Sequence, residues 1–176
     1  PVHPGYDDVM AAPSIGNLTD DDDDGDIDED DIPDVVFMTF ANGQYSSSGA
    51  LVAISGDGSG TLWSLRAPGG EHVMGSAQVA IGDLEGDGSP EVCTAGQTSA
   101  VVCVNADGSF KWAAGTQIDA YGAPAIADMD GDGLAEVVFG RQVFDHAGNL
   151  LGVGVRGIGG GHAMSFPVDL DDDGQL

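Results

Sequence analysis

A short acidic loop that recurs along the chain is the feature that most constrains its fold. In its clearest copy, residues 128–136, acidic side chains stand at positions 1, 3, 5 and 9 and a glycine stands at position 6. Residues 83–91 repeat this layout, and residues 169–174 begin it again. Apolar runs at 79–81 and 137–139 border the loops. Since a solvated acidic tail would be one block without apolar residues, we expect these acids to lie in loops between strands.

The spacing of the acids is typical of a calcium site. Calcium takes roughly six to eight oxygen ligands, which alternate side chains and a main-chain carbonyl at position 7 can supply. Glycine at position 6 permits the sharp turn of the loop. The predicted ligands of the second, third and fourth loops are Asp83, Glu85, Asp87, Ser89 and Glu91; Asp128, Asp130, Asp132, Leu134 and Glu136; and Asp169, Asp171 and Asp173.

The first acidic loop is longer and permits two ligand registers. One is a twelve-residue EF-hand-type register with an aliphatic residue at position 8. Its predicted ligands are Asp20, Asp22, Asp24, Asp26, Asp28 and Asp31. The other register uses Asn17, Thr19 and Asp21 as early ligands, and Asp34 as the counterpart of Glu91 and Glu136. A sliding register and two ions in this loop are both open, and the chain is predicted to bind about three to four Ca²⁺ ions.

The charge of the chain narrows the choice of partners. The sequence has 30 acidic residues against four Lys and Arg, and its formal charge is −26. Of the acids, 23 fall in the four loops. Nucleic acid and anionic membranes would be repelled, and no run approaches the roughly 20 apolar residues of a membrane span. Because crowded carboxylates repel one another, bound metal is expected to contribute its binding free energy to folding.

Four short apolar segments recur in each period of the sequence. One leads into the acidic loop, two follow it, and a glycine-bearing turn such as 56–58, 106–108 or 146–148 precedes the last. Four short strands per roughly 40 residues are typical of a β-propeller blade. The sequence therefore predicts an all-β chain of four-stranded antiparallel blades. In this single partial propeller, over residues 1–176, the blades are placed at 14–66, 77–115 and 122–155, and a fourth begins at 164–176.

These repeats resemble FG-GAP or VCBS repeats, the calcium-binding blades of the integrin α-subunit head and of many bacterial secreted proteins. The segment Tyr121-Gly122-Ala123-Pro124 is similar to the Gly-Ala-Pro half of the FG-GAP motif, and the loop at Asp128 follows it as in the family. The resemblance implies a propeller, usually seven-bladed, on an extracellular or cell-surface protein that serves in binding. With about three and a half blades, the sequence is expected to be part of a longer chain, and the missing blades to come from that chain or from other chains.

The two cysteines are predicted to face each other within the second blade. With a turn near Thr98, Cys93 on one strand falls opposite Cys103 on the next, and a disulfide can form if their Cα atoms lie within about 7 Å. The alternative is a pair of small buried residues, as at the counterpart positions Val138 and Val143. An oxidising, calcium-rich exterior favours the disulfide.

The pattern favours a non-enzymatic scaffold in which Ca²⁺ orders the loops of one rim and exposed loops bind a protein or carbohydrate at the cell surface. No catalytic residue is predicted. One alternative is a propeller-based polysaccharide lyase or hydrolase, for which Arg141 and Tyr121 are the candidate bases near a metal loop. The other is a subunit of a surface filament or multimeric assembly, because an open array leaves strand edges that pair between chains. The fold alone does not decide among these functions.

Overall fold

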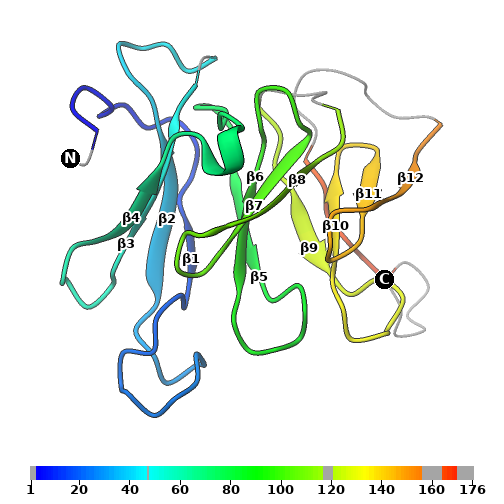
Figure 1. The fold of residues 1–176 in the computed structure, drawn as a ribbon, viewed down its shortest axis with the longest axis horizontal. Helices are drawn as coiled ribbons and strands as arrows, with labels where there is room; N and C mark the ends of the chain where they lie inside the picture. The colour runs from blue at the N-terminus through cyan, green and yellow to red at the C-terminus, as the bar shows by residue number, and fades with distance from the viewer. Residues whose placement is uncertain (1–2, 47, 117–120, 156–163, 170–176) are drawn as a thin grey trace.

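Three four-stranded antiparallel sheets, arranged side by side, make up the computed structural model, which describes residues 3–46, 48–116, 121–155 and 164–169 (Figure 1). The first sheet consists of β1 (Ser14–Gly16), β2 (Asp34–Thr39), β3 (Ala50–Ile54) and β4 (Thr61–Leu65). The second consists of β5 (Val79–Gly82), β6 (Glu91–Thr94), β7 (Val101–Asn105) and β8 (Phe110–Ala114). The third consists of β9 (Ala125–Ala127), β10 (Glu136–Phe139), β11 (Gln142–Phe144) and β12 (Leu150–Val153). A short 3₁₀ turn, η1 (Pro68–Gly70), follows the first sheet.

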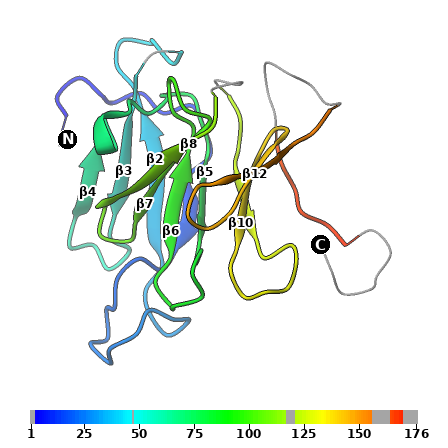
Figure 2. The ribbon, with the colours of Figure 1, turned by 45° about the vertical axis from the view of Figure 1, so that its right-hand side comes forward.

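The prediction of an all-β chain built from four-stranded antiparallel repeats is confirmed. In each sheet the strands pair in chain order, so every repeat is a simple meander. The described sheets form an open array and do not close into a ring (Figure 2). Most of the predicted fourth repeat, from residue 170 onward, lies outside the described residues.

Apolar side chains fill the space between neighbouring sheets. Val36 and Met38 of β2 pack with Val92 and Val104 of the second sheet, because alternate residues of a strand point to one face. The second sheet is covered on both faces, and all four residues of β6 are buried. The third sheet ends in a strand with exposed apolar side chains, where Leu151 is 59% exposed. The second sheet is therefore the core of the described array.

The first strands of the three sheets lie next to one another along the inner side of the array. β1 contacts β5, and β5 contacts β9. Each contact depends on a glycine at the end of one strand and an isoleucine on the next. A Cβ added to Gly16 would lie 3.2 Å from Ile81, and one added to Gly82 would lie 2.9 Å from Ile126. Glycine at these positions allows the close spacing of the strands.

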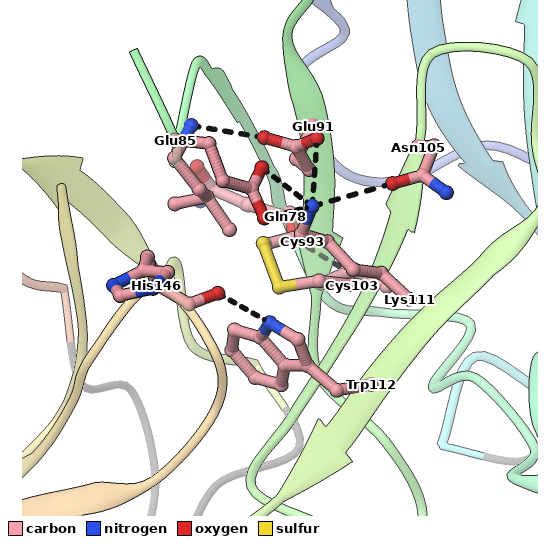
Figure 3. Close-up of a disulfide and its surroundings, with 11 residues drawn as sticks. Gln78, Glu85, Glu91, Cys93, Cys103, Asn105, Lys111, Trp112 and His146 are labelled. Atoms are coloured by element: carbon pink, nitrogen blue, oxygen red, sulfur yellow. Dashed lines mark hydrogen bonds and ion pairs between the residues drawn. A yellow bond between two sulfur atoms is a disulfide. The ribbon is translucent and has the colours of Figure 1, made fainter. Parts of the chain in front are cut away.

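Two tryptophans join the outer strands of the first and second sheets to the sheet that follows each of them. Trp63 on β4 donates its indole N–H to the carbonyl of Ala106, at 2.7 Å. Trp112 on β8 makes the same bond to the carbonyl of His146, at 2.9 Å (Figure 3). Both acceptors lie in the turn before the last strand of the next sheet. The sheets are thus held together by a repeated hydrogen bond as well as by apolar packing.

Each of these tryptophans also lies against a glycine of the turn that it contacts. A Cβ added to Gly108 would lie 2.8 Å from Trp63, and one added to Gly148 would lie 2.7 Å from Trp112. The corresponding glycine of the first sheet, Gly58, has no atom within 4 Å of such a Cβ. Gly108 and Gly58 share a left-handed backbone, with φ of 82° and 85°. The two positions therefore differ chiefly in the tryptophan contact.

This difference predicts that Gly108→Ala destabilises the protein more than Gly58→Ala. Both variants place a side chain in the left-handed region, at a cost of roughly 1 to 2 kcal/mol. Gly108→Ala also forces the ring of Trp63 to move, which adds about 1 to 3 kcal/mol. Chemical denaturation of the two variants measures the difference in the free energy of unfolding. Equal losses would show that the tryptophan contact is not tight.

A disulfide joins Cys93 and Cys103, which are directly opposite each other on β6 and β7 (Figure 3). Their Cα atoms are 4.2 Å apart, so the predicted pairing is confirmed. Both side chains are fully buried between the second and third sheets. The bond therefore cross-links the central hairpin within the core of the array.

Replacing both cysteines by valine, the residue found at the two counterpart positions of the third sheet, is expected to lower the free energy of unfolding by about 2 to 3 kcal/mol, because the unfolded chain loses a cross-link. Denaturant titration under oxidising conditions measures this loss. Reduced wild-type protein should unfold at the same denaturant concentration as the variant. A variant as stable as the oxidised wild type would contradict the expectation.

Candidate metal centre

The three described acidic loops lie at the same end of the array, where each joins the first strand of a sheet to the second (Figure 1). We call this end the acidic rim, and it comprises residues 17–33, 83–90 and 128–135. Neighbouring loops touch: the N–H of Ala135 donates to the carbonyl of Leu84, at 2.9 Å. The order of one loop therefore affects the next.

The third loop is folded around the carboxylate at its first position. Asp128 accepts N–H bonds from Gly131 at 2.7 Å and from Gly133 at 2.9 Å. At the other end of the loop, one carboxylate oxygen of Glu136 accepts the N–H of Met129, at 2.9 Å. The N–H bonds that Asp128 accepts lower its pKa, and the bond from Gly133 is the main cause. The loop is thus shaped by its own N–H groups around an ionised carboxylate.

Three carboxylates of the third loop converge on one point. Asp128, Asp130 and Glu136 each offer an oxygen, and the three oxygens lie within 4.8 Å of one another. Hard anionic oxygens at this spacing fit Ca²⁺, which prefers such ligands. Asp132, a further predicted ligand, accepts the N–H of Leu134 at 2.8 Å and lies outside the group.

The first loop repeats this geometry within its EF-hand-type register. The carboxylate of Asp20 accepts the N–H of Asp24 at 3.2 Å and that of Gly25 at 3.0 Å. Asp31 closes the loop by accepting the N–H of Asp21, at 2.6 Å. The group of converging carboxylates here is Asp20, Asp22 and Asp24. Acidic groups able to hold a metal ion therefore occur in the first and third loops.

The predicted ligands of the later half of the first loop lie outside that group. They are Asp26, Asp28 and Asp31. Asp31 turns its second oxygen to the N–H of Asp28, at 2.9 Å, and its pKa is lowered by the N–H bonds from Asp28 and Asp21.

The contacts of the alternative register are also present. Its residues, 17–34, form an outer loop around residues 20–31 of the EF-hand-type register. Asp34 is the first residue of β2 and pairs with Gly16 of β1. In the same way, Glu136 is the first residue of β10 and pairs with Ala127 of β9. Asp34 accepts the N–H of Leu18 at 2.8 Å, as Glu136 accepts that of Met129. The closing contacts of both registers thus exist together, with residues 20–31 nested inside residues 17–34.

The two ends of the outer loop differ in whether their side-chain oxygens already accept hydrogen bonds. Asp34 is fully buried and also accepts bonds from the hydroxyl of Thr19 and the N–H of Gly56, each at 3.1 Å, so its oxygens are used within the protein. At the other end, Oδ1 of Asn17 is a buried atom with no hydrogen-bond partner among the described residues. A buried amide oxygen without a donor is a ligand that suits a hard cation.

The pKa is raised for several carboxyl groups of the first loop, through desolvation or a shared hydrogen bond and then through neighbouring charges. For Asp26, the main cause is a hydrogen bond shared with the carboxyl of Asp24, followed by the nearby charges of Asp24 and Asp28. For Asp21, partial desolvation comes first and the charge of Asp34 second. A bound cation would relieve these unfavourable contacts.

The second loop differs from its neighbours because a lysine enters it. Nζ of Lys111 on β8 lies 2.5 Å from a carboxylate oxygen of Glu85 and 3.1 Å from one of Glu91 (Figure 3). Among the described residues, which include this whole loop, no three of its carboxylates form a converging group. Asp83 still accepts N–H bonds from Gly86 and Gly88, each at 2.7 Å, so the loop has the same backbone shape.

Sequence reasoning missed Lys111, since it lies in a strand well removed from the loop. The available signal was that only one of the four cationic residues falls in the fourth strand of a repeat, and that this repeat has Glu in place of Asp at loop position 3. Burial by itself would lower the pKa of Lys111, but the hydrogen bonds to Glu85 and Glu91 outweigh it and raise that pKa. The ammonium therefore stays charged and has no lone pair for general-base chemistry.

The two candidate bases lie away from the acidic rim, and most of the fourth loop is outside the described residues. Asp171 and Asp173 lie outside the described residues, so the fourth loop stays a prediction. Tyr121 precedes β9 and Arg141 follows β10, at the ends of these strands opposite the acidic loop. The side chain of Tyr121 packs on Tyr45, with ring centroids 6.0 Å apart. Neither candidate base lies beside an acidic loop.

Comparison with known proteins identifies the family. A family model described as an FG-GAP-like repeat matches residues 26–94 and 83–139, more than half of the chain, and the chain therefore belongs to the FG-GAP-like repeat family. It is similar to the crystal structure of the V. cholerae biofilm matrix protein Bap1, with 32% sequence identity and a TM-score of 0.74. The match covers 86% of this chain and 26% of that protein, so the chain spans about a quarter of its length.

Comparison with curated proteins found no match to the chain. Within the described residues there is no helix of the length and hydropathy that a bilayer crossing requires.

Asp34→Asn is expected to destabilise the protein by about 2 to 3 kcal/mol, because an amide nitrogen would face a backbone N–H that now donates to a buried charged oxygen. The matched control is Asp30→Asn in the same loop, where the side chain is exposed and the expected change is below about 0.5 kcal/mol. Denaturant unfolding in the presence of a chelator measures both. Equal stability of the two variants would show that the outer loop is not closed by Asp34.

Proposed function

We propose that this chain is a calcium-ordered repeat scaffold of an extracellular matrix or cell-surface protein. In this proposal, the three described sheets are consecutive blades of a β-propeller, and Ca²⁺ bound in the acidic loops orders the rim that connects their strands. The ordered array presents exposed loops to a protein or carbohydrate ligand. The remaining blades come from the same chain or from partner chains.

The observation that carries the proposal is the convergence of carboxylates in two loops of the same geometry. Asp20, Asp22 and Asp24 in the first loop, and Asp128, Asp130 and Glu136 in the third, place oxygens within 4.8 Å of one another. Without a cation these charges repel at short range. A bound Ca²⁺ would supply positive charge and tie the two ends of each loop together.

Asp128 and Glu136 have different roles in ordering the acidic rim. Asp128 organises the backbone turn through its N–H bonds. Glu136 begins β10 and uses one oxygen on the N–H of Met129, which leaves its other oxygen for an ion. Because Glu136 belongs to both the loop and the strand, a ligand contact there would fix the strand against the loop.

Two observations support the extracellular setting. The disulfide between Cys93 and Cys103 is typical of oxidising compartments. The similar protein Bap1 is described as a biofilm matrix protein. An adhesive scaffold is favoured over a lyase or hydrolase because Tyr121 and Arg141 lie away from the acidic loops.

Calcium is expected to raise the stability of the wild-type protein and to do so less in Glu136→Gln. The glutamine keeps an oxygen for the N–H of Met129 but loses the charged ligand. At calcium a hundred times its dissociation constant, loss of one ion removes about 3 kcal/mol of ligand-dependent stabilisation. Thermal and denaturant unfolding, with calcium and with chelator, measure the increment for each variant.

The matched control is Glu29→Gln, an exposed acid of the first loop outside the converging group. It should keep the full calcium-dependent increment. A wild-type melting curve that is the same in calcium and in chelator would overturn the proposed function.

A further inference from the structure

We infer that the ammonium group of Lys111 takes the place of a calcium ion in the second loop, so that the central repeat is ordered without metal while its two neighbours bind it. This inference rests on the proposed function, because it concerns which loops of the rim take an ion. It assigns to Lys111 the role of setting the calcium stoichiometry of the array.

The contacts of Lys111 satisfy the ammonium group fully. Its nitrogen faces acceptors on three residues: it lies 2.5 Å from each carboxylate oxygen of Glu85, 3.1 Å from Glu91 and 3.4 Å from Asn105. An ammonium group has three N–H donors, so each donor has an acceptor. The side chain of Lys111 is 16% exposed and that of Glu91 is 4% exposed. The group is therefore an enclosed cation held at the inner end of the loop.

The lysine engages the loop positions that converge in the third loop. Glu85 and Glu91 stand at positions 3 and 9, which correspond to Asp130 and Glu136. In the third loop these two positions, with Asp128, place oxygens around a common point. In the second loop they are turned to the ammonium group instead. A divalent ion there would lose two ligands and meet a like charge at close range.

The neighbouring repeats have no cation at the corresponding place. On the fourth strand, Trp112 pairs with Cys103 as Trp63 pairs with Ala53, and Gly152 pairs with Val143. The residue before each is Lys111 in the second repeat, Leu62 in the first and Leu151 in the third. The lysine is thus a replacement of an apolar side chain at one position of the repeat.

A second change in the same repeat fits the first. Loop position 3 is Asp22 in the first loop, Asp130 in the third, and Glu85 in the second. The extra methylene group of Glu85 extends its carboxylate toward β8, where Lys111 lies. Both ion pairs found among the described residues are those that Lys111 makes with Glu85 and Glu91. The two substitutions act together to give the loop an internal counter-ion.

A loop ordered by lysine has a consequence for the rim. Leu84 of the second loop accepts the N–H of Ala135 in the third, and the second sheet is covered on both faces by its neighbours. The central loop therefore keeps its shape when calcium is scarce. It then provides a fixed support against which the third loop closes on its ion.

The test compares two glutamine variants at the same loop position, using native mass spectrometry to count calcium ions per chain. Each replaced glutamate accepts the N–H of loop position 2 at 2.9 Å, so each variant removes the same charge and retains the same backbone acceptor. Glu136→Gln is expected to lose one ion relative to wild type. Glu91→Gln is expected to keep the wild-type number, because its loop holds none.

The converse variant is Lys111→Leu, which introduces the residue found at this position in the other two repeats. It is expected to bind one calcium ion more than wild type. Arg141→Leu, which removes an exposed positive charge away from the rim, is expected to leave the count unchanged. Lys111→Met, with an unbranched side chain that follows the lysine stem, provides a second variant if the leucine variant does not fold.

The outcomes separate this inference from the proposed function. If Glu136→Gln loses an ion and Glu91→Gln also loses one, or if neither lysine variant gains one, calcium scaffolding stands and the role of Lys111 is overturned. If the wild-type protein binds no calcium, the proposed function is overturned and the inference with it. A loss in Glu136→Gln alone, together with a gain on removal of Lys111, supports both.

Discussion

The concentration of carboxylates at one end of the sheets is the constraint on which the rest of the structure depends. A chain with a formal charge of −26 can fold only if the acids that crowd together receive compensating contacts. Backbone N–H groups provide the first of these, since Asp20, Asp83 and Asp128 each organise a turn around their oxygens. These turns fix the loops that join the strands, and the strands in turn place the apolar residues that pack the sheets together.

Compensation by N–H groups is incomplete, and the three loops complete it in different ways. The first has a nested pair of closing acids, Asp31 and Asp34; both are buried, and the oxygens of Asp34 are used within the protein. The third retains three converging carboxylates. The second has Lys111. One backbone design therefore accommodates several charge arrangements, because the turn is set by Asp and Gly positions that all repeats share.

The sequence predicted the features that depend on local pattern. Strand alternation, glycine turns and loop spacing gave the four-stranded repeat, and the opposed positions of Cys93 and Cys103 gave the disulfide. Features that depend on pairing across the fold were harder to foresee. The two registers of the first loop appeared as alternatives, since nothing local shows that Asp34 lies opposite Gly16. Lys111 was missed because its neighbours Glu85 and Glu91 are brought to it only when β8 folds beside the loop.

The tryptophan contacts give the array a direction when it is placed under mechanical load. Trp63 and Trp112 each reach forward to the turn of the next sheet, whereas the third sheet has Gly152 at that position. The two interfaces between the described sheets are thus reinforced by an indole bond. Tension along the described array is therefore opposed at both junctions by an indole hydrogen bond as well as by apolar packing, and each bond runs from the earlier sheet to the later one.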